Sequence, residues 1–156
     1  MMLEHRVLLL RAGASLAERS IVDGESGVPL GTARWRRENG RAWRHWFRRG
    51  IMEVREREDE PLVFTVRRAW SLFPRRDVRD ADEQEVGFLS GLRVHDRFGR
   101  CVADFDNGVF RAPSQHILAE LRTTTDGQNL TFGNDIAGEP FVKMLLLAAV
   151  LAFGSP

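Results

Sequence analysis

The last stretch of the chain, residues 140–153, is the feature that most constrains the fold. It reads Pro-Phe-Val-Lys-Met-Leu-Leu-Leu-Ala-Ala-Val-Leu-Ala-Phe, with Lys143 as its one polar side chain. Leu, Met and Ala favour helix, Pro140 suits a first helical position, and Gly154 can end the helix after Phe153. A helix that is apolar on every side has no solvent face, so it must be buried in a core or in a membrane.

The length of this helix separates the two environments. Its 14 residues span about 21 Å, less than the roughly 30 Å of a hydrocarbon layer. The stretch also lacks a Trp or a basic cluster at its C-terminal end, where a spanning segment is often anchored. We therefore predict a buried core helix over residues 140–153. Membrane insertion, helped by tilt or by a partner, is the alternative.

Short β-like runs fill the chain ahead of this helix. Gly, Asp, Asn and Pro interrupt them every eight to twelve residues, which is typical of a sandwich or barrel. About a dozen strands without a linker predict one domain over residues 1–156. The expected strands are His5–Arg11, Ser15–Asp23, Val28–Arg37, Arg41–Arg49, Met52–Arg57, Leu62–Arg68, Arg76–Asp80, Glu85–Leu89, Leu92–Asp96, Arg100–Asp104, Gly108–Arg111, Gln115–Thr123 and Gln128–Phe132.

A weak internal repeat indicates hairpins. Asp ends a strand at three places, and a small residue starts the return strand seven or eight positions later. The three pairs are Asp23 with Gly31, Asp80 with Gly87 and Asp96 with Ala103. Asp at a turn accepts hydrogen bonds from nearby backbone amides, and a small residue relieves crowding on the return strand. We interpret these aspartates as turn-forming residues and not as catalysts.

About twelve strands followed by one wholly apolar helix pose a packing problem. A mainly β, antiparallel closed barrel of about twelve strands, with the C-terminal helix buried in its bore, is a simple solution. Closure removes exposed sheet edges, and the helix offers apolar surface to the inward-facing side chains. This is the fold that we predict.

Three segments resemble the phospholipid scramblase-related proteins. They are the hairpin Glu53–Val66, the hairpin Val78–Phe88, and the tail in which Phe132-Gly133 is followed by Val142-Lys143-Met144 and the apolar run 145–153. The resemblance extends to the superfamily that includes the LURP-one-related and Tubby C-terminal domains. It implies a twelve-stranded barrel around a central hydrophobic helix, and a role at anionic phospholipid. Function varies widely within one fold, so the fold does not fix the activity.

The chain departs from the eukaryotic scramblases in motifs that matter for function. It has neither a Pro-rich N-terminal tail nor a multi-cysteine palmitoylation cluster. The stretch that matches their acidic calcium segment keeps Asp126, Asn134, Asp135 and Glu139. Calcium takes six to eight oxygen ligands, and the oxygens here are sparse. We therefore expect no metal and no other cofactor.

Composition gives further limits on location and partners. The net charge is near +1, so bulk charge points to no particular partner, but basic residues comprise 22 Arg and one Lys. Guanidinium groups bind phosphate through a bidentate fork, although a GC-rich genome gives the same bias. The single cysteine, Cys101, excludes an internal disulfide. The N-terminus does not resemble a signal peptide, so we expect a cytoplasmic protein that can associate peripherally with a membrane.

An Arg/Trp-rich segment is the strongest candidate site. Residues 34–49 are expected to form one hairpin around Asn39-Gly40, the strongest short hairpin signal. Its candidate lipid-binding residues are Arg34, Trp35, Arg36, Arg37, Arg41, Trp43, Arg44, Trp46, Arg48 and Arg49. A second basic patch comprises Arg67, Arg68, Trp70, Arg75 and Arg76.

Three interpretations of this segment stay open. Trp and Arg together suit an anionic membrane interface. Interleaved aromatic and basic residues also suit single-stranded nucleic acid. In the third interpretation the segment is ordinary barrel wall, with Trp35 and Trp43 pointing inward and Arg34, Arg36 and Arg44 facing water.

No group of residues resembles a catalytic or metal site. Asp104-Phe-Asp106-Asn107-Gly108 begins like a calcium loop, but its Gly is at the fifth place and Gln115 stands where a bidentate Glu should fall. The four histidines have no ligand spacing, and no serine lies in a nucleophile elbow. We expect a non-enzymatic module that binds anionic phospholipid head groups. A soluble structural or protein-interaction barrel is the alternative, with nucleic-acid binding third.

Overall fold

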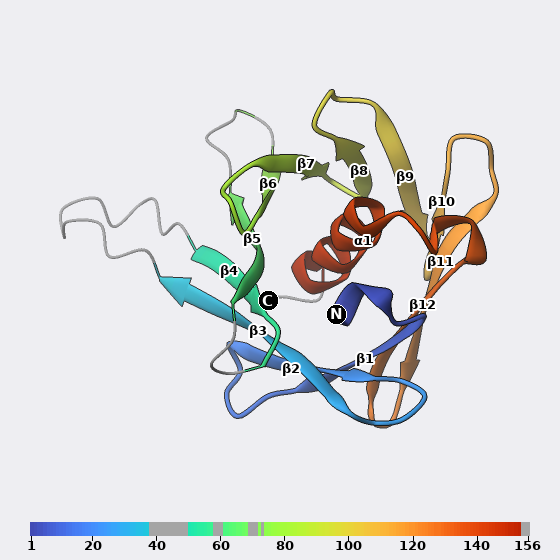
Figure 1. Cartoon of the computed structure of the whole chain (residues 1–156). Helices are drawn as coiled ribbons and strands as arrows, with labels where there is room; N and C mark the ends of the chain where they lie inside the picture. Colours follow the sequence, from blue (N-terminus) through green and yellow to red (C-terminus); the bar gives the residue numbers. More distant parts are fainter. Residues whose placement is uncertain (38–49, 58–60, 69–71, 73, 154–156) are drawn as a thin grey trace, which may run out of the picture.

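The computed structural model describes residues 1–37, 50–57, 61–68, 72 and 74–153. Within these residues, twelve antiparallel strands form a closed barrel (Figure 1). Each strand pairs with its neighbours along the chain, and β1 pairs with β12 to close the ring. The strands are β1 (Val7–Ala12), β2 (Glu18–Asp23), β3 (Pro29–Arg37), β4 (Gly50–Arg55), β5 (Leu62–Arg68), β6 (Arg75–Asp80), β7 (Glu85–Ser90), β8 (Arg93–Asp96), β9 (Cys101–Asp106), β10 (Val109–Arg111), β11 (Ile117–Thr124) and β12 (Gly127–Phe132). The predicted fold class is confirmed.

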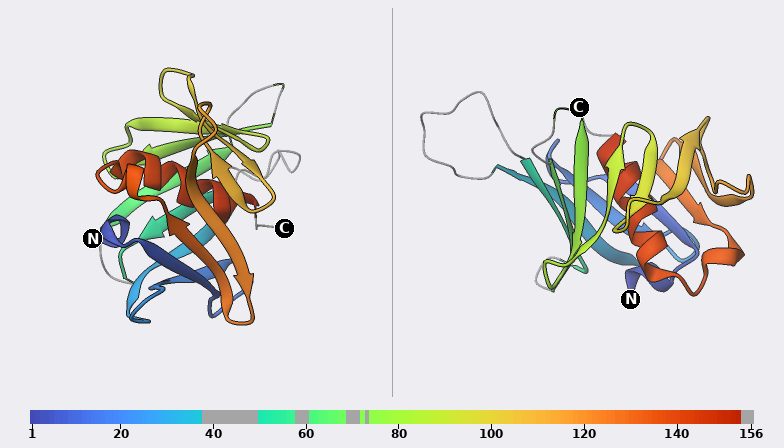
Figure 2. Two further views of the ribbon diagram at one scale, coloured as in Figure 1. Left: turned by 90° about the vertical axis from the view of Figure 1, so that its right-hand side faces the viewer. Right: turned by 90° about the horizontal axis from the view of Figure 1, so that it is seen from above.

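The apolar tail forms the helix α1 (Pro140–Phe153), with the bounds that the sequence predicts. Figures 1 and 2 show α1 inside the ring of strands, so that it fills the bore. Its residues from Lys143 to Ala152 are all buried, and Leu146 and Leu147 have no exposed surface. Burial on every side explains why the helix needs no polar face. In the described part of the chain, no helix combines the length and the apolar character needed to cross a membrane.

Two short 3-10 helices lie around the start of α1. The first, η1 (Met2–Glu4), buries Met2 and Leu3 beside α1. The second, η2 (Asn134–Ile136), buries Ile136 and contacts α1 and β11. The backbone amide of Met2 donates a hydrogen bond of 2.7 Å to Glu56, just beyond β4. Apolar residues of η1 and η2 thus extend the core at the end of the barrel where α1 begins.

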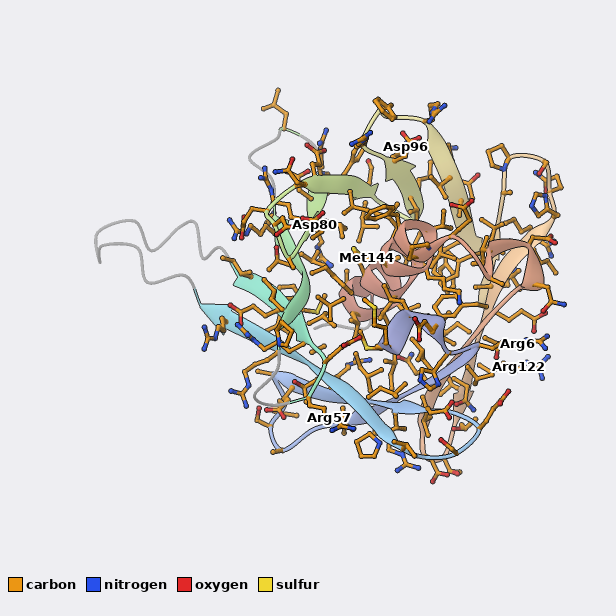
Figure 3. The ribbon with its side chains drawn as sticks, in the orientation of Figure 1. Arg6, Arg57, Asp80, Asp96, Arg122 and Met144 are labelled. Atoms are coloured by element: carbon orange, nitrogen blue, oxygen red, sulfur yellow. The ribbon has the colours of Figure 1, made fainter. Side chains whose placement is uncertain are left out.

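Alternation along each strand divides the side chains between bore and solvent. On β5, Phe64 and Val66 are fully buried in the core, and Val78 on β6 is their counterpart. Figure 3 shows the same division at the level of the molecule, with Met144 inside the ring and Arg57 and Arg122 at its periphery. The core therefore consists of α1, the inward row of every strand and the buried residues of η1 and η2.

The repeated aspartates form turns, as the sequence predicts. The carboxylate of Asp80 accepts the backbone N–H groups of Asp82 and Gln84, and that of Asp96 accepts those of Phe98 and Arg100. Asp23 likewise accepts two backbone N–H groups of the turn that follows it. These side chains replace backbone partners at tight turns, which supports a structural role.

Two return-strand glycines sit where no side chain fits. A Cβ atom on Gly31 would lie 2.2 Å from the carbonyl oxygen of Arg55, and one on Gly87 would lie 2.2 Å from that of His95. Both neighbours are backbone atoms of adjacent strands, which cannot move aside like a flexible side chain. The predicted need for a small residue at these positions is confirmed.

The pairing predicted for β3 is wrong. Its described residues pair with β2 on one side and with β4 on the other, with Trp35 opposite Met52 and Arg37 opposite Gly50. Both edges of β3 are therefore occupied, and its partner is β4 in place of the strand expected over residues 41–49, which lie outside the described part of the chain. The physical reason is the core: β4 supplies Met52 and Val54, both buried, in the alternation that the bore requires.

Candidate functional site

Three side chains of the Arg/Trp-rich segment are described, and all three belong to the barrel wall. Arg34 and Arg36 point outward and form ion pairs with Glu18 (2.8 Å) and Glu53 (3.4 Å). Trp35 lies between them on the inward side and packs, partly buried, against the core. These three side chains point as the barrel-wall interpretation predicts, with Trp35 inward and Arg34 and Arg36 outward.

The other candidates in this segment stay predictions. The backbone of Arg37 pairs with Gly50 at the end of β3. The residues outside the described part of the chain are Arg41, Trp43, Arg44, Trp46, Arg48 and Arg49, together with Trp70 of the second patch.

The second basic patch separates into two outward and two inward arginines. Arg67 points outward and donates to Glu83 (2.9 Å). Arg75 also points outward, where it pairs with Asp77 (2.8 Å) and Glu85 (3.0 Å). The guanidinium carbon of Arg75 lies 3.8 Å from the centre of the Phe88 ring. The charges of the outward pair are therefore balanced on the wall.

Arg68 and Arg76 belong to the inward rows of their strands. Arg68 follows Phe64 and Val66 at intervals of two on β5, and Arg76 precedes Val78 by two on β6. The strand register places the two arginines directly opposite each other. Directly opposite residues have Cβ atoms about 5 Å apart, and like charges in that position are destabilising. The described register thus places two cations directly across from each other at the end of β5 and the start of β6.

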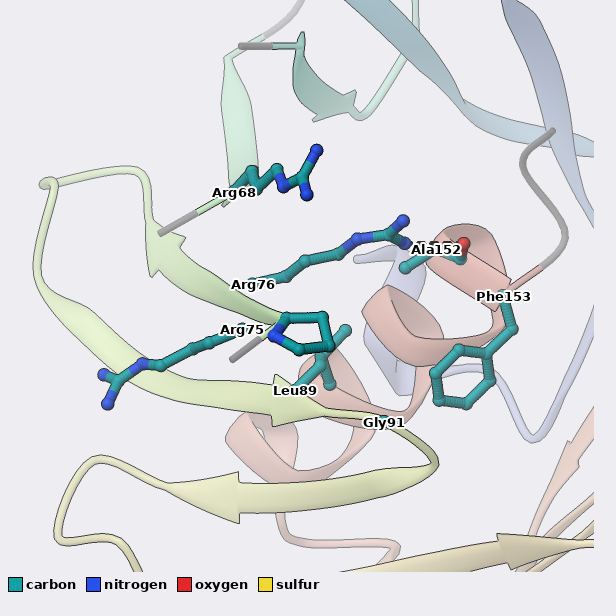
Figure 4. Close-up of a pocket in the computed structure, with 8 residues that line it drawn as sticks. Arg68, Arg75, Arg76, Leu89, Gly91, Ala152 and Phe153 are labelled. Atoms are coloured by element: carbon teal, nitrogen blue, oxygen red, sulfur yellow. Dashed lines mark hydrogen bonds between the residues drawn. The ribbon is translucent and has the colours of Figure 1, made fainter. Parts of the chain in front are cut away.

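The two arginines line a pocket of about 420 Å³ at the end of the barrel where α1 finishes (Figure 4). We call it the mouth pocket; its residues are Arg68, Pro74, Arg75, Arg76, Leu89, Gly91, Ala152 and Phe153. Figure 4 shows the Arg68 and Arg76 side chains extending in the same direction, towards the end of α1, whereas Arg75 extends away. The pocket is thus built from β5, β6, β7 and the last turn of the central helix.

Arg76 is tied to the end of α1. Its Nη1 donates a hydrogen bond of 2.7 Å to the backbone carbonyl of Ala152. The last carbonyls of a helix lack partners within the helix and carry partial negative charge, so a cation there is favourable. Burial, with a further contribution from the Arg68 charge, lowers the pKa of Arg76 below its usual value. Arg76 is therefore held in place by the end of α1, while its burial and the charge of Arg68 oppose its ionised form.

The mouth pocket is cationic. Among its described lining residues there is no carboxylate, and the nearest strand-neighbour carboxylates, Asp77 and Glu85, are paired with Arg75 outside. A guanidinium group has five N–H donors, of which Arg76 uses one on Ala152. Two guanidinium groups with donors to spare can bind an oxyanion such as phosphate in bidentate fashion.

Exposed apolar side chains flank the mouth pocket. Leu72, in the connection between β5 and β6, is 100% exposed, and Leu92, next to the pocket residue Gly91, is 56% exposed. Loop residues of this kind do not contribute to the core. The same end of the barrel thus combines a cationic pocket with apolar side chains at the loop tips.

The sequence analysis named all four arginines of the second patch. It did not predict that two of them face outward and two face the mouth pocket. The signal that could have separated them is phase, because Arg68 and Arg76 continue the apolar rows of Phe64 and Val78 whereas Arg67 and Arg75 do not. The carbonyl of Ala152 could not have been found in this way, since every residue has one.

Other candidate sites are structural. In the segment 104–108, residues 104–106 end β9 and residues 107–108 form the turn to β10, as the strand–turn–strand interpretation predicts. Within the described ranges, no group of three or more His, Cys, Asp or Glu side chains could hold a metal ion. Asn134 and Asp135 of the calcium-like segment lie in η2.

The comparisons with known proteins found no matching family model, no matching curated protein and no matching solved structure. The resemblance to the scramblase-related and Tubby-like proteins therefore rests on the hairpin sequences and the apolar tail, and it stays a prediction.

Proposed function

We propose that this protein is a non-enzymatic binding module that contacts anionic phospholipid head groups at a membrane surface. The surface that makes the contact is the end of the barrel that holds the mouth pocket. The observation that carries the proposal is the combination of Arg68 and Arg76 with the exposed Leu72 and Leu92 at this one end. Apolar tips can enter the interface while cations meet the phosphates.

The position of the basic side chains supports the proposal more strongly than the net charge of the chain does. The whole chain has a net charge of +1, so long-range attraction to an acidic surface is weak. A basic side chain held near the surface gains about 1 kcal/mol from anionic lipid. Binding therefore has to come from cations gathered at one end, as in the mouth pocket, and should fall as salt screens them.

The Arg/Trp-rich segment is joined to the barrel at this end. The register places Arg36, Ile51 and Arg67 in one row across β3, β4 and β5, next to the row that ends at Arg68. Arg37 and Gly50, the described residues on either side of residues 38–49, pair with each other beside that row. Arg37 and Gly50 are thus at the same end of the barrel as the mouth pocket, whereas the candidate cations and tryptophans of residues 41–49 lie outside the described part of the chain.

The alternative function is a structural or protein-interaction barrel with no lipid role. It is favoured by the ion pairs of Arg34 and Arg36, which balance the described part of the Arg/Trp-rich segment. Under the lipid proposal we place the protein in the cytoplasm, peripheral to a membrane.

Flotation with vesicles tests the proposal. We expect binding to vesicles rich in acidic phospholipid, weak binding to zwitterionic vesicles, and steep loss of binding as salt increases. Replacing both Leu72 and Leu92 with Asp should abolish flotation. Replacing both Val28 and Phe98 with Asp is the matched control, because it adds the same two charges at exposed apolar residues in the β2–β3 and β8–β9 turns at the opposite end. Absence of wild-type flotation at low salt would refute the proposal.

A further inference from the structure

We infer that the mouth pocket is a binding site for one phosphate monoester, held between Arg68 and Arg76 beside the C-terminal end of α1. Its role at a membrane rests on the proposed function, but the site itself does not. The shared chemistry is a dianionic phosphate group, whether it belongs to a lipid head group or to a soluble metabolite.

The first argument is the repulsion between the two arginines. Two guanidinium groups opposite each other on neighbouring strands repel. Each wall arginine beside them, Arg67 and Arg75, has a carboxylate partner. Among the described residues that line the mouth pocket, no carboxylate pairs with Arg68 or Arg76. An anion placed between Arg68 and Arg76 would supply the missing negative charge.

The second argument concerns the helix end. The C-terminus of a helix carries about half a negative charge, which by itself disfavours an anion. Arg76 donates to the carbonyl of Ala152 and so offsets that charge at its source. The same contact fixes the guanidinium group against the end of α1, so its remaining donors are oriented before a ligand arrives. Preorganised donors lower the entropic cost of binding.

The third argument is size and charge. A volume of about 420 Å³ falls within the range of about 300–1,000 Å³ for small-ligand sites. It has room for a phosphate and part of the group that carries it. Leu89 and Phe153 form its apolar lining, which suits the organic part of an ester. Two cations match the two charges of a phosphate monoester better than the single charge of a carboxylate or a phosphodiester.

Titration of the whole protein with inorganic phosphate, at constant ionic strength set by chloride, tests the site. We expect one phosphate per chain by calorimetry and a rise in Tm, because a ligand that binds only the folded state stabilises it. Arg68→Gln should weaken the affinity about tenfold or more, since a charge-assisted hydrogen bond is lost. Arg67→Gln is the control: it removes the same charge from the adjacent position, where the side chain faces outward and pairs with Glu83.

A stability measurement separates ligand binding from a purely structural role. Arg68→Gln should not lower Tm in the absence of phosphate, because it removes a like-charge contact. Arg76→Gln should lower both Tm and phosphate affinity, because Arg76 also bonds Ala152. Equal phosphate affinity in Arg68→Gln and the wild type would overturn the inference, and so would a loss of affinity in Arg67→Gln of the same size.

Vesicles of matched charge distinguish the source of the phosphate. Phosphatidic acid is a phosphate monoester and phosphatidylglycerol is a diester. A lipid ligand is supported if the protein floats more strongly with phosphatidic acid and if Arg68→Gln abolishes this preference. Phosphate binding without that preference supports a soluble monoester. Flotation on acidic vesicles without any phosphate binding would overturn the pocket and leave the docking proposal standing. Phosphate binding without flotation would refute docking and support the pocket.

Discussion

The Nζ atom of Lys143 donates a hydrogen bond of 2.9 Å to the backbone carbonyl of Leu3. It joins the first turns of α1 to η1 across the length of the sequence. The Lys143 side chain is only 3% exposed and its Nζ lies 5.3 Å from the centre of the Phe132 ring. The one lysine of the chain thus holds the N-terminal segment against the end of the bore where α1 begins.

This buried cation makes stability depend on pH. Burial lowers the pKa of Lys143 below its ordinary value of 10.5, and the Glu4 carboxylate acts in the opposite direction. The unfolded chain therefore binds this proton more tightly than the folded protein. Burying the charged lysine destabilises the folded protein. This destabilisation is complete below the pKa of Lys143 in the folded protein and disappears as pH rises to 10.5, the ordinary pKa.

Lys143→Met tests this linkage, because methionine keeps the apolar chain and does not titrate. The free energy of unfolding of the wild type should rise relative to that of the variant as pH approaches 10.5. The relative rise should be about 1.4 kcal/mol for each tenfold difference in proton affinity between the folded and unfolded chains. Urea unfolding from pH 7 upward measures it. Burial raises the pKa of Cys101, but that group is present in both proteins and cancels. Parallel profiles would show that Lys143 is not responsible.

The central position of α1 predicts extreme sensitivity to charge at Leu146. This residue has no exposed surface, so Leu146→Asp places a carboxylate in the bore without a partner. The cost is several kcal/mol, comparable with the whole stability of a typical domain. We expect the variant to be unfolded by circular dichroism. Phe141→Asp in the first turn of the same helix is the control: Phe141 is exposed, so its variant should fold. A cooperative melt of Leu146→Asp near the wild-type Tm would contradict a buried helix.

Gly87 should tolerate no side chain. A Cβ atom there would lie 2.2 Å from the His95 carbonyl oxygen and 3.0 Å from a methyl group of Leu145 in α1. Gly87→Ala must therefore push β7 away from β8 or from the helix, and we expect a loss of roughly 1–3 kcal/mol. Gly138→Ala, with open space around the new methyl group, should be neutral or slightly stabilising. Equal denaturation midpoints for the two variants would mean that the strands yield more easily than the close contact indicates.

The parts of the fold that could be predicted are those in which a residue pattern is compatible with a single structural role. An all-apolar helix must be enclosed, and residues 140–153 form the helix that the sequence predicts. An Asp before a turn bonds the turn, as Asp80 and Asp96 do. The prediction failed at β3, where a strong local signal, Asn39-Gly40, competed with the need of the bore for Met52 and Val54. Burial of a whole strand outweighs the preference of one turn.

The candidate site was less predictable because it depends on contacts between distant segments. A basic patch around residues 67–76 is visible in the sequence, but the opposition of Arg68 and Arg76 requires the register of β5 and β6. The contact between Arg76 and Ala152 joins residues that are 76 positions apart. No local pattern contains that information. Strand phase could have separated the inward from the outward arginines.

The Arg/Trp-rich segment gives the last prediction, which concerns membrane binding. Replacing Arg44, Arg48 and Arg49 together with Gln should weaken binding to acidic vesicles by roughly 3 kcal/mol at low salt, at about 1 kcal/mol for each cation near the surface. Flotation across a series of lipid concentrations measures the change. The matched control replaces Arg6, Arg57 and Arg122 with Gln, which removes the same charge from exposed positions on the outside of the barrel (Figure 3).

The control defines what the result means. If both triple variants lose binding equally, net charge drives the association and no particular surface is involved. If the Arg44, Arg48 and Arg49 variant binds like the wild type, the contact lies elsewhere on the same end, and Arg68 with Arg76 is the next pair to replace. Loss of binding in that variant alone, with Tm unchanged, identifies residues 41–49 as part of the membrane contact.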